Sequence, residues 1–370
     1  MSELRVIISG GGTGGHIFPA IAIANALKKR KPDSKILFVG ANGRMEMEKV
    51  PQAGYEIKGL NIAGFQRGSI VKNLTLPFKI IGSLLSANNI VRSFKPAVAI
   101  GVGGYASGPL LRAAGFAGVP TVIQEQNSFA GITNKLLAKN AKVICTAYEG
   151  MDKVFPKDKI VLTGNPVRAA IVEMQKTGSN LRTEAYKYFG LDPQRKTILI
   201  IGGSLGARTL NQSVESAINR IKDGDVQILW QTGKVYFENC KNVGAGISQL
   251  KTLQFIDRMD LAYACANVIV SRAGALSISE LQLVGKPVIL VPSPNVTDDH
   301  QTHNAMALVK KGAAIIIKDS EAKLNLIGAA FDLLKNEAQQ QQLSSNISKM
   351  GIADAAERIV DEILKVSKAN

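Results

Sequence analysis

Short apolar runs alternate with segments of helical periodicity along most of this sequence. Val6–Ile8 and Val268–Val270 are wholly apolar, and Thr197–Ile201 is apolar after its first residue. Such runs are typical of strands buried on both faces of a parallel sheet. The same prediction extends to Lys35–Val39, Tyr55–Leu60, Ala97–Ile100, Pro120–Gln124, Lys142–Thr146, Ile160–Leu162, Val226–Thr232, Thr252–Phe255 and Val288–Val291.

Between these strands, apolar residues recur at the spacing of a helix that buries one face. Helices are predicted over the residues after Pro19, and over Glu46–Ala53, about Ile70–Phe94, Leu210–Ile221 and Ala353–Val366. The alternation of strand and helix occurs twice, with the turn Thr163–Arg168 between the two runs. We therefore expect an α/β chain of two Rossmann-like domains facing each other across a cleft, residues 1–164 and 165–345. The remaining residues, 346–370, form a helix expected to pack back on the first domain.

The stretch Arg5–Pro19 (RVIISGGGTGGHIFP) joins a buried strand, a glycine-rich loop and the start of a helix. In such a loop, backbone N–H groups and the positive end of the helix converge on one point, where phosphates bind. Similar loops follow later strands, at Gly101–Pro109, Gly202–Arg208 and Ser271–Glu280. Ligands of open α/β sheets bind at the carboxyl ends of the strands, so these loops are expected to border ligand sites.

Gly10, Gly12 and Gly15 also fit the spacing G-x-G-x-x-G of dinucleotide-binding folds. Those folds place an acidic residue at the end of the second strand, where it binds a ribose. The corresponding segment here, Gly40–Asn42, has no acid, so the sequence disfavours NAD.

His16 is one of three histidines in the chain and lies at the end of the first glycine loop. One interpretation is a histidine that caps the helix. The other is a proton acceptor placed where an anionic substrate docks.

The composition indicates a globular chain from a reducing compartment. Its 370 residues are 46% hydrophobic, with a mean hydropathy of +0.08, and suffice for two domains with separate cores. The sequence shows no signal-peptide pattern and no apolar run of the roughly 18 residues that a membrane span needs. Cys145, Cys240 and Cys265 lack metal-binding spacing and are interpreted as buried thiols of a cytoplasmic protein.

The net charge of +16 is unevenly distributed. Residues 1–164 carry 21 basic against 9 acidic residues, whereas the rest carries 24 against 20. No acidic residue occurs between Ile57 and Gln124, and Ile70–Phe94 interleaves basic with apolar side chains. This pattern favours an anionic membrane surface over nucleic acid as the partner, although some of these apolar groups will face the core.

Seven motifs occur in order across nearly the whole chain: GGTGGH followed by FP, GGYASGP, EQN, GNPVR, GGSLGAR, SRAGALSISE and HQTHNA. Together they resemble the MurG family of bacterial glycosyltransferases, which have the GT-B architecture. These enzymes add GlcNAc from UDP-GlcNAc to the lipid-linked muramyl-pentapeptide (lipid I), making lipid II for peptidoglycan synthesis. The resemblance implies UDP-GlcNAc and lipid I as substrates.

The resemblance implies that the donor binds mainly to the second domain. Glu280 is similar to the family glutamate that accepts hydrogen bonds from the ribose, and Arg168 to the arginine that neutralises the diphosphate. Their alternative roles are a first-turn glutamate on a helix dipole and a surface arginine. Asn127 and Gln301 resemble the side chains that bond the sugar hydroxyls, and Ile256 would lie against the uracil. The other expected donor-binding residues are Thr13, Gly14, Gly15, Ser204, Ala275, Leu276, Ser277, Ile278 and Ser279.

The resemblance also implies an inverting reaction, in which the C4 hydroxyl of the acceptor MurNAc attacks C1 of GlcNAc opposite UDP. His16 is the expected base, with Glu125 as the second candidate. Loop N–H groups, helix ends and Arg168 would stabilise the leaving diphosphate. The residues expected to bind the acceptor diphosphate are Gly12, Gly103, Gly104 and Tyr105.

An acceptor with a lipid tail places the enzyme on a membrane. We expect a peripheral protein on the cytoplasmic face of the bacterial inner membrane, with the basic segment facing anionic lipid. This location leaves room for partners among other cell-wall synthesis proteins.

The chain departs from the family at His300-Gln301, where members often carry paired glutamines, and the role of His300 stays open. Asp298, Asp299, His300 and His303 match no familiar metal site, so no metal or other cofactor is expected. Two other functions remain: a UDP-GlcNAc epimerase with the same fold and donor site, and a donor-binding protein without catalysis.

Overall fold

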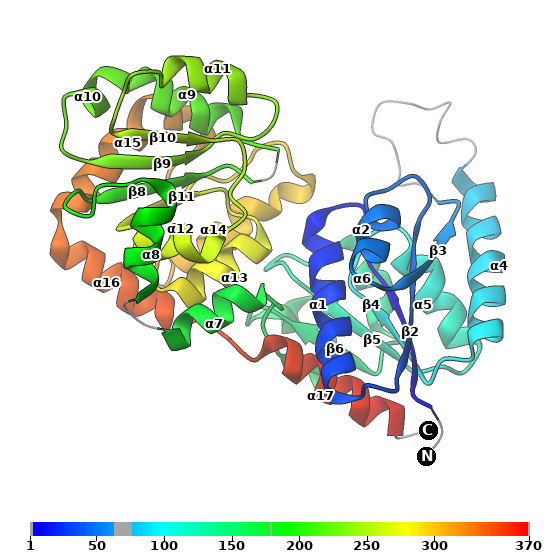
Figure 1. Ribbon diagram of the computed structural model, residues 1–370. Helices are drawn as coiled ribbons and strands as arrows, with labels where there is room; N and C mark the ends of the chain where they lie inside the picture. Colours follow the sequence, from blue (N-terminus) through cyan, green and yellow to red (C-terminus); the bar gives the residue numbers. More distant parts are fainter. Residues whose placement is uncertain (1–2, 63–75, 178–179, 204, 369–370) are drawn as a thin grey trace. The chain divides into compact units, whose positions relative to one another are not determined.

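The computed structural model describes residues 3–62, 76–177, 180–203 and 205–368 (Figure 1), and the chain divides into two compact units. Unit 1 comprises Met1–Val167 and Asp354–Asn370, and unit 2 comprises Arg168–Ala353. These divisions fall a few residues after the boundaries expected at 164/165 and 345/346. Asn165 explains the first difference, because its side chain accepts a hydrogen bond from Gln124 Nε2 at 2.9 Å and donates to Gln126 O at 3.0 Å, both in unit 1.

Unit 1 contains a seven-stranded parallel sheet in the order β3-β2-β1-β4-β5-β6-β7. Its strands are β1 (Arg5–Ser9), β2 (Lys35–Ala41), β3 (Glu56–Leu60), β4 (Val98–Gly101), β5 (Thr121–Glu125), β6 (Val143–Thr146) and β7 (Ile160–Leu162). Its helices are α1 (Gly14–Arg30), α2 (Glu46–Gln52), α4 (Leu76–Phe94), α5 (Ser107–Phe116), α6 (Ile132–Ala138) and α17 (Ala355–Lys368), with short 3-10 turns at Met151–Lys153 and Lys157–Lys159.

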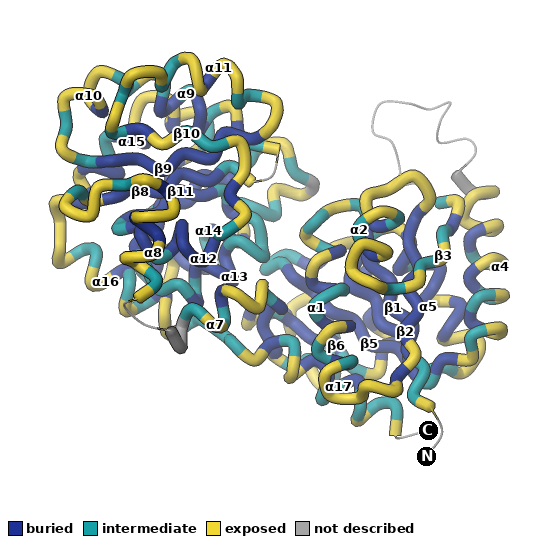
Figure 2. Tube along the Cα trace, in the orientation of Figure 1, coloured by how far each residue is buried: buried dark blue, intermediate teal, exposed yellow. Residues whose placement is uncertain are grey.

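The two faces of this sheet are buried by different helices. Val6 and Ile8 of β1 join an apolar cluster with residues of α1 and α17. Ile7, which points the opposite way, joins a second cluster with residues of α4, α5 and α6. Successive side chains of a strand alternate between faces, so a strand covered on both sides must be apolar throughout, as Figure 2 shows for the dark central strands.

Unit 2 repeats the plan with a six-stranded parallel sheet in the order β10-β9-β8-β11-β12-β13. Its strands are β8 (Thr197–Ile201), β9 (Gln227–Gln231), β10 (Leu250–Leu253), β11 (Val268–Ser271), β12 (Val288–Leu290) and β13 (Ile315–Ile316). Its helices are α7 (Ala169–Thr177), α8 (Asn180–Phe189), α9 (Arg208–Ser216), α10 (Ile218–Lys222), α11 (Phe237–Val243), α12 (Met259–Cys265), α13 (Ala275–Val284), α14 (His300–Val309), α15 (Asp319–Lys335) and α16 (Glu337–Ser348), with a 3-10 turn at Thr297–Asp299.

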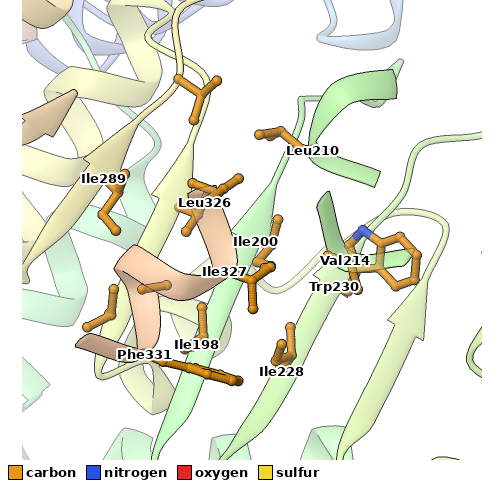
Figure 3. Close-up of a cluster of buried hydrophobic side chains, with 14 of the residues drawn as sticks. Ile198, Ile200, Leu210, Val214, Ile228, Trp230, Ile289, Leu326, Ile327 and Phe331 are labelled. Carbon is orange, nitrogen blue, oxygen red and sulfur yellow. The ribbon is translucent and has the colours of Figure 1, made fainter. Parts of the chain in front are cut away.

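The core on one face of this sheet packs α9 and α15 against the strands (Figure 3). Trp230, the chain's single tryptophan, is fully buried there, and its indole N–H donates to Asn211 Oδ1 at 2.9 Å. A buried Trp needs such a partner because an unpaired N–H costs free energy in an apolar surrounding.

The predicted fold class, α/β with two Rossmann-like domains, is confirmed, and every strand predicted from the sequence is present to within two residues at each end. Helix boundaries were predicted less well. The first helix begins at Gly14, so Pro19 lies inside it and Gly14 and Gly15 belong to its first turn. The helix predicted over Leu210–Ile221 is two helices that meet at Ala217, where the backbone leaves helical geometry.

The long helix predicted from Ile70 is described from Leu76 onward as α4, and the preceding residues of that prediction lie outside the described part of the chain. No helix among the residues that the structure describes is both long enough and apolar enough to span a bilayer.

Helix α17 closes one face of unit 1, where Ile359, Val360 and Ile363 are buried with the strands. We predict that Ile359→Ala destabilises unit 1 by about 2–5 kcal/mol, the usual cost of emptying a buried aliphatic site. Amide hydrogen exchange in β1 and β4 should accelerate about 30-fold or more. The fluorescence transition of Trp230, in unit 2, should stay unchanged. The control Glu357→Ala alters an exposed position of the same helix, and equal exchange in the two variants would show that α17 adds no stability.

Candidate functional site

The loops after β8 and β11 lie on neighbouring strands of unit 2, at the point where the strand order reverses. Helix α13 starts right after the second loop, and its first intrahelical bond runs from Ile278 N to Gly274 O at 2.9 Å. The N–H groups of the first turn, Ala275–Ser277, therefore precede the helical ladder, and these residues are partly exposed. Such N–H groups and the positive helix end bind anions.

Within the predicted donor-binding segment Ala275–Ser279, only the first three residues are partly exposed. Ile278 is fully buried in the core, and Ser279 is nearly buried, with its hydroxyl donating to Ala275 O at 3.1 Å. The prediction for these two positions, in which backbone N–H groups and the Ser279 hydroxyl bind the diphosphate, stays a prediction. Ser204, on the loop after β8, lies outside the described residues.

Glu280 lies further along α13 and accepts hydrogen bonds from two residues. Both of its oxygens accept from Arg168, Nε to Oε1 at 2.6 Å and Nη2 to Oε2 at 2.7 Å. The Tyr263 hydroxyl donates to Oε2 at 3.2 Å. Glu280 is buried, whereas the Arg168 side chain is 51% exposed. The two residues predicted to bind different parts of the donor thus form a bidentate pair with each other.

The surroundings fix the protonation states of Arg168 and Tyr263. Burial alone would lower the pKa of Arg168, but the hydrogen bonds and charge of Glu280 outweigh it and raise that pKa. Burial, followed by the nearby Glu280 charge, raises the pKa of Tyr263 well above its usual range. Tyr263 therefore remains a hydrogen-bond donor, a role that the sequence did not reveal.

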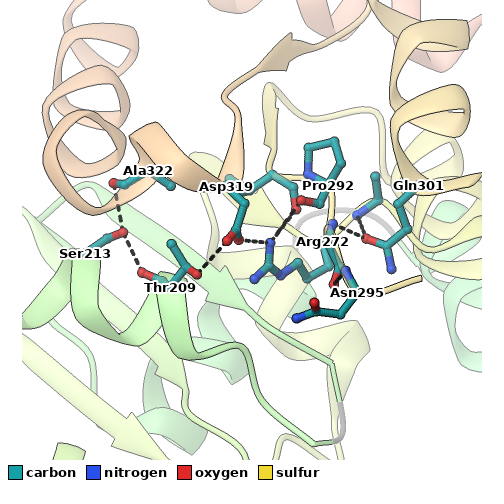
Figure 4. A network of polar contacts seen from close by, with 11 residues as sticks. Thr209, Ser213, Arg272, Pro292, Asn295, Gln301, Asp319 and Ala322 are labelled. Carbon is teal, nitrogen blue, oxygen red and sulfur yellow. Dashed lines mark hydrogen bonds and ion pairs between the residues drawn. The ribbon is translucent and has the colours of Figure 1, made fainter. Parts of the chain in front are cut away.

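Gln301 ties two loops of unit 2 together. Its Oε1 accepts from Ala273 N at 3.2 Å and from Ser293 N at 2.9 Å (Figure 4). The side-chain oxygen is therefore already used by the backbone, and a sugar hydroxyl would have to accept from Nε2. Ile256, the predicted uracil neighbour, is buried, while the adjacent Phe255 is 47% exposed.

In unit 1 the loops after β1 and β4 pack directly against each other. Gly104 has a φ of +88°, and a Cβ at this position would overlap the backbone of Gly11. Both features require glycine. The first turns of α1 and α5 follow these loops with uncharged or weakly basic residues, Gly14–His16 and Ser107–Pro109. Gly12, Thr13, Gly103 and the exposed Tyr105 lie at the same sheet edge.

A buried carboxylate holds the first of these loops. Glu46 accepts from Gly12 N at 2.9 Å and from Ala41 N at 3.0 Å, and it is 1% exposed. A Cβ on Gly11 would overlap the Glu46 carboxyl group. No acidic residue lies at the end of β2 itself, but Glu46, five residues after Ala41, orients the backbone of this loop.

The ring of His16 lies over Gly103, and its Nδ1 is 3.0 Å from Gly11 O. A carbonyl oxygen only accepts, so Nδ1 carries a proton and, in the neutral ring, the lone pair is on Nε2. This tautomer suits a base that acts through Nε2.

Both carboxylate oxygens of Glu125, the second candidate base, accept hydrogen bonds from the protein. Its Oε1 accepts from Asn127 N at 3.0 Å and Asn127 Nδ2 at 3.3 Å, and its Oε2 accepts from Gly131 N and Asn134 Nδ2, both at 2.9 Å. The residue is 1% exposed. These contacts give Glu125 the structural role of fixing the loop after β5, which weighs against a role as base. Asn127, expected at the sugar, also belongs to this loop.

Within the residues described, no three His, Cys, Asp or Glu side chains are grouped so that they would bind a metal ion. Asp298 and Asp299 adopt left-handed backbone angles, and Asp299 Oδ1 accepts from Thr302 Oγ1 at 2.7 Å.

Lys286, just after α13, links this segment to the end of α12 by donating to Ala264 O at 2.7 Å and Ala266 O at 2.5 Å. Burial lowers its pKa to about 8 from 10.5. Between these values the unfolded chain binds more protons than the folded chain, so this group makes stability rise with pH.

We therefore predict that the stability of the parent, relative to Lys286→Met, increases by about 2 kcal/mol between about pH 7.5 and pH 9.5. Urea unfolding followed by Trp230 fluorescence measures this difference. A difference that is constant or falls with pH would contradict the assignment.

The comparisons with known proteins agree with this geometry. The glycosyltransferase family 28 N-terminal domain matches residues 6–146, and the family 28 C-terminal domain matches residues 197–359. A Cytophaga hutchinsonii protein named UDP-N-acetylglucosamine–N-acetylmuramyl-(pentapeptide) pyrophosphoryl-undecaprenol N-acetylglucosamine transferase is 56% identical over 98% of this chain and 96% of its own.

Solved structures fall into a close and a distant group. Acinetobacter baumannii MurG is 30% identical, with a TM-score of 0.79 over 98% of this chain and 99% of its own. UDP-GlcNAc 2-epimerase from Neisseria meningitidis has a TM-score of 0.66 over 98% of this chain and 100% of its own, but at 15% identity it shares the fold alone. The chain belongs to glycosyltransferase family 28 and, within it, to the MurG transferases.

Proposed function

We propose that this chain transfers GlcNAc from UDP-GlcNAc to the C4 hydroxyl of the MurNAc residue of lipid I, forming lipid II. The observation that carries the proposal is the arrangement at α13. The first-turn N–H groups of the partly exposed residues Ala275–Ser277 suit a diphosphate, and Glu280, held by Arg168, suits the two hydroxyls of a ribose. The high identity to transferases favours transfer over epimerisation.

Donor binding would exchange the partners of the Arg168–Glu280 pair. Ribose hydroxyls donate to Glu280, and Arg168, which is half exposed, turns toward the diphosphate. Arg168 then pairs with the diphosphate and Glu280 with the ribose hydroxyls, so neither charged group is left without a partner. As the sugar–phosphate bond breaks, the growing negative charge on UDP is stabilised by Arg168 and the N–H groups of α13.

The acceptor is assigned to unit 1. The N–H groups of Gly103, Gly104 and Tyr105, in the loop after β4, would bind its diphosphate together with the loop after β1. The N–H of Gly12, also predicted for this site, already donates to Glu46. His16 takes the proton of the attacking hydroxyl through Nε2, because Nδ1 is oriented by Gly11 O.

The experiment that tests the function is incubation with UDP-GlcNAc and a short-chain lipid I analogue. A disaccharide product together with UDP supports the proposal. Release of ManNAc would instead indicate an epimerase, and donor that binds but is never consumed would indicate a binding protein.

Glu280→Gln tests the donor site. The change removes the charge at constant volume, and we predict that UDP-GlcNAc affinity falls by about 1–3 kcal/mol, roughly 5- to 150-fold. Calorimetry measures the affinity. Glu321→Gln, an exposed glutamate of α15, serves as control, and identical donor affinity in both variants would remove Glu280 from the site.

His16→Ala separates chemistry from binding. We predict that kcat falls by about 10²–10⁴ while donor affinity stays within about twofold, since a general base contributes on that order to the rate. His303→Ala, at an exposed position of unit 2, should retain the parent rate. A His16 variant with more than about a third of the parent kcat would exclude His16 as the base.

A membrane face on α4 completes the proposal of a peripheral enzyme at the cytoplasmic surface of the inner membrane. Phe78, Ile81 and Leu85 project from this helix with 77%, 58% and 63% of their surface exposed. Lys79 and Arg92 lie on the same helix, and large apolar groups beside basic ones suit an anionic bilayer surface. Lys72, part of the same basic segment, lies outside the described residues.

We predict that Lys79→Gln/Arg92→Gln weakens binding to anionic vesicles about 30-fold at low salt, since each basic residue near such a surface contributes about 1 kcal/mol. UDP-GlcNAc affinity should not change. Lys241→Gln/Lys251→Gln, two exposed lysines of unit 2, provides the control in vesicle sedimentation. Equal sedimentation of both double variants and the parent would show that α4 is not the membrane face.

A further inference from the structure

A chain of polar contacts in unit 2 joins the strand ends around the proposed donor site (Figure 4). Arg272, the first residue after β11, donates from Nη1 to Asp319 Oδ1 at 2.5 Å. The same Nη1 lies 3.1 Å from Val291 O and 3.2 Å from Pro292 O, directly after β12. One guanidinium nitrogen thus links β11, β12 and the start of α15.

Asp319 extends the link to the loop after β8. Its Oδ2 accepts from Thr209 Oγ1 at 2.8 Å, in the first turn of α9. Ser213, one turn later, donates to Thr209 O at 2.8 Å and to Ala322 O at 2.9 Å. The N-terminus of α9 is therefore fixed to the N-terminus of α15 and, through Arg272, to the residues that enter α13.

Arg272 has the features of a structural cation. Its side chain is 13% exposed and that of Asp319 is 20% exposed. The opposite charges of Arg272 and Asp319 neutralise each other, and Arg272 Nη1 already has three acceptors. Arg168 is also paired with a carboxylate, but its side chain is half exposed and its partner, Glu280, is a proposed ligand for the ribose.

We propose that Arg272, Asp319 and Thr209 form a positioning network that sets the spacing between the N-termini of α9 and α13, and that Arg272 is not itself the counter-ion of the donor phosphates. The inference rests on the proposed function, in which the N-terminus of α13 binds the donor diphosphate, and extends that site to the neighbouring N-terminus of α9. A diphosphate bridging two sets of N–H groups needs them at a fixed separation, and supporting hydrogen bonds of this kind hold a site within a fraction of an ångström.

Asp319→Asn distinguishes the two roles of Arg272. If Arg272 were a direct phosphate ligand, removal of its neutralising partner would strengthen UDP binding. If the network positions the helix ends, the same change weakens UDP binding, by about tenfold on the scale seen when supporting partners of a ligand site are lost. Thr209→Val, which cuts the link to α9 at similar volume, should weaken it in the same direction.

Calorimetry with UDP and with uridine provides a readout that general loss of stability would not reproduce. The network acts on the phosphates alone, so uridine affinity should stay within about twofold in both variants. Asp332→Asn is the matched control, because it removes an exposed ion pair with Arg220 from the same helix α15.

UDP binding that is unchanged or tighter in Asp319→Asn would overturn the inference, as would equal losses for UDP and uridine. A parent protein that binds uridine as tightly as UDP would instead contradict the proposed diphosphate site. The two failures are therefore distinguishable.

Discussion

Both proposed binding sites depend on the N–H groups at helix N-termini, and on the topology that gathers them. In a parallel sheet every strand must be followed by a crossover, so each helix begins at the carboxyl edge of the sheet. Where the strand order reverses, two such helix starts become neighbours with no strand between them. Both units have this arrangement, with the β1 and β4 loops in unit 1 and the β8 and β11 loops in unit 2. A substrate pair with two diphosphates matches two sites of this kind.

Buried and partly buried carboxylates set the shape of these loops. Glu46 accepts from the loop after β1, Glu125 from the loop after β5, and Asp319 fixes α9 directly and the β11 loop through Arg272. Each accepts N–H, O–H or guanidinium donors from the protein, so the charge is used inside the fold and the N–H groups aimed at the ligand stay oriented. Glu280 belongs to a different class, because its partner Arg168 is half exposed and, in the proposed function, is exchanged for a ligand.

The sequence predicted the fold well because burial on both faces leaves a clear record in it. Strands such as β8 are apolar at nearly every position, and the glycine loops mark the strand ends. Helix boundaries were harder, since Pro19 suggested a start that the glycines before it already provide. The sequence carries no comparable signal for which side chains contact each other in the folded chain. Nothing near Glu125 in the chain indicated that Asn134 and Gly131 would donate to both of its oxygens, and nothing in the sequence linked Asp319 to Arg272, 47 residues earlier.

In the proposed function, the donor diphosphate binds to the N-terminus of α13 in unit 2, and the ribose hydroxyls of the same donor bind to Glu280. A crystal structure of the chain with bound UDP measures this directly. We expect phosphate oxygens within hydrogen-bond distance of the N–H groups of Ala275–Ser277, and a Glu280 carboxylate that accepts from the ribose. UDP bound to the loops after β1 and β4 of unit 1, with the Arg168–Glu280 pair unchanged, would contradict it.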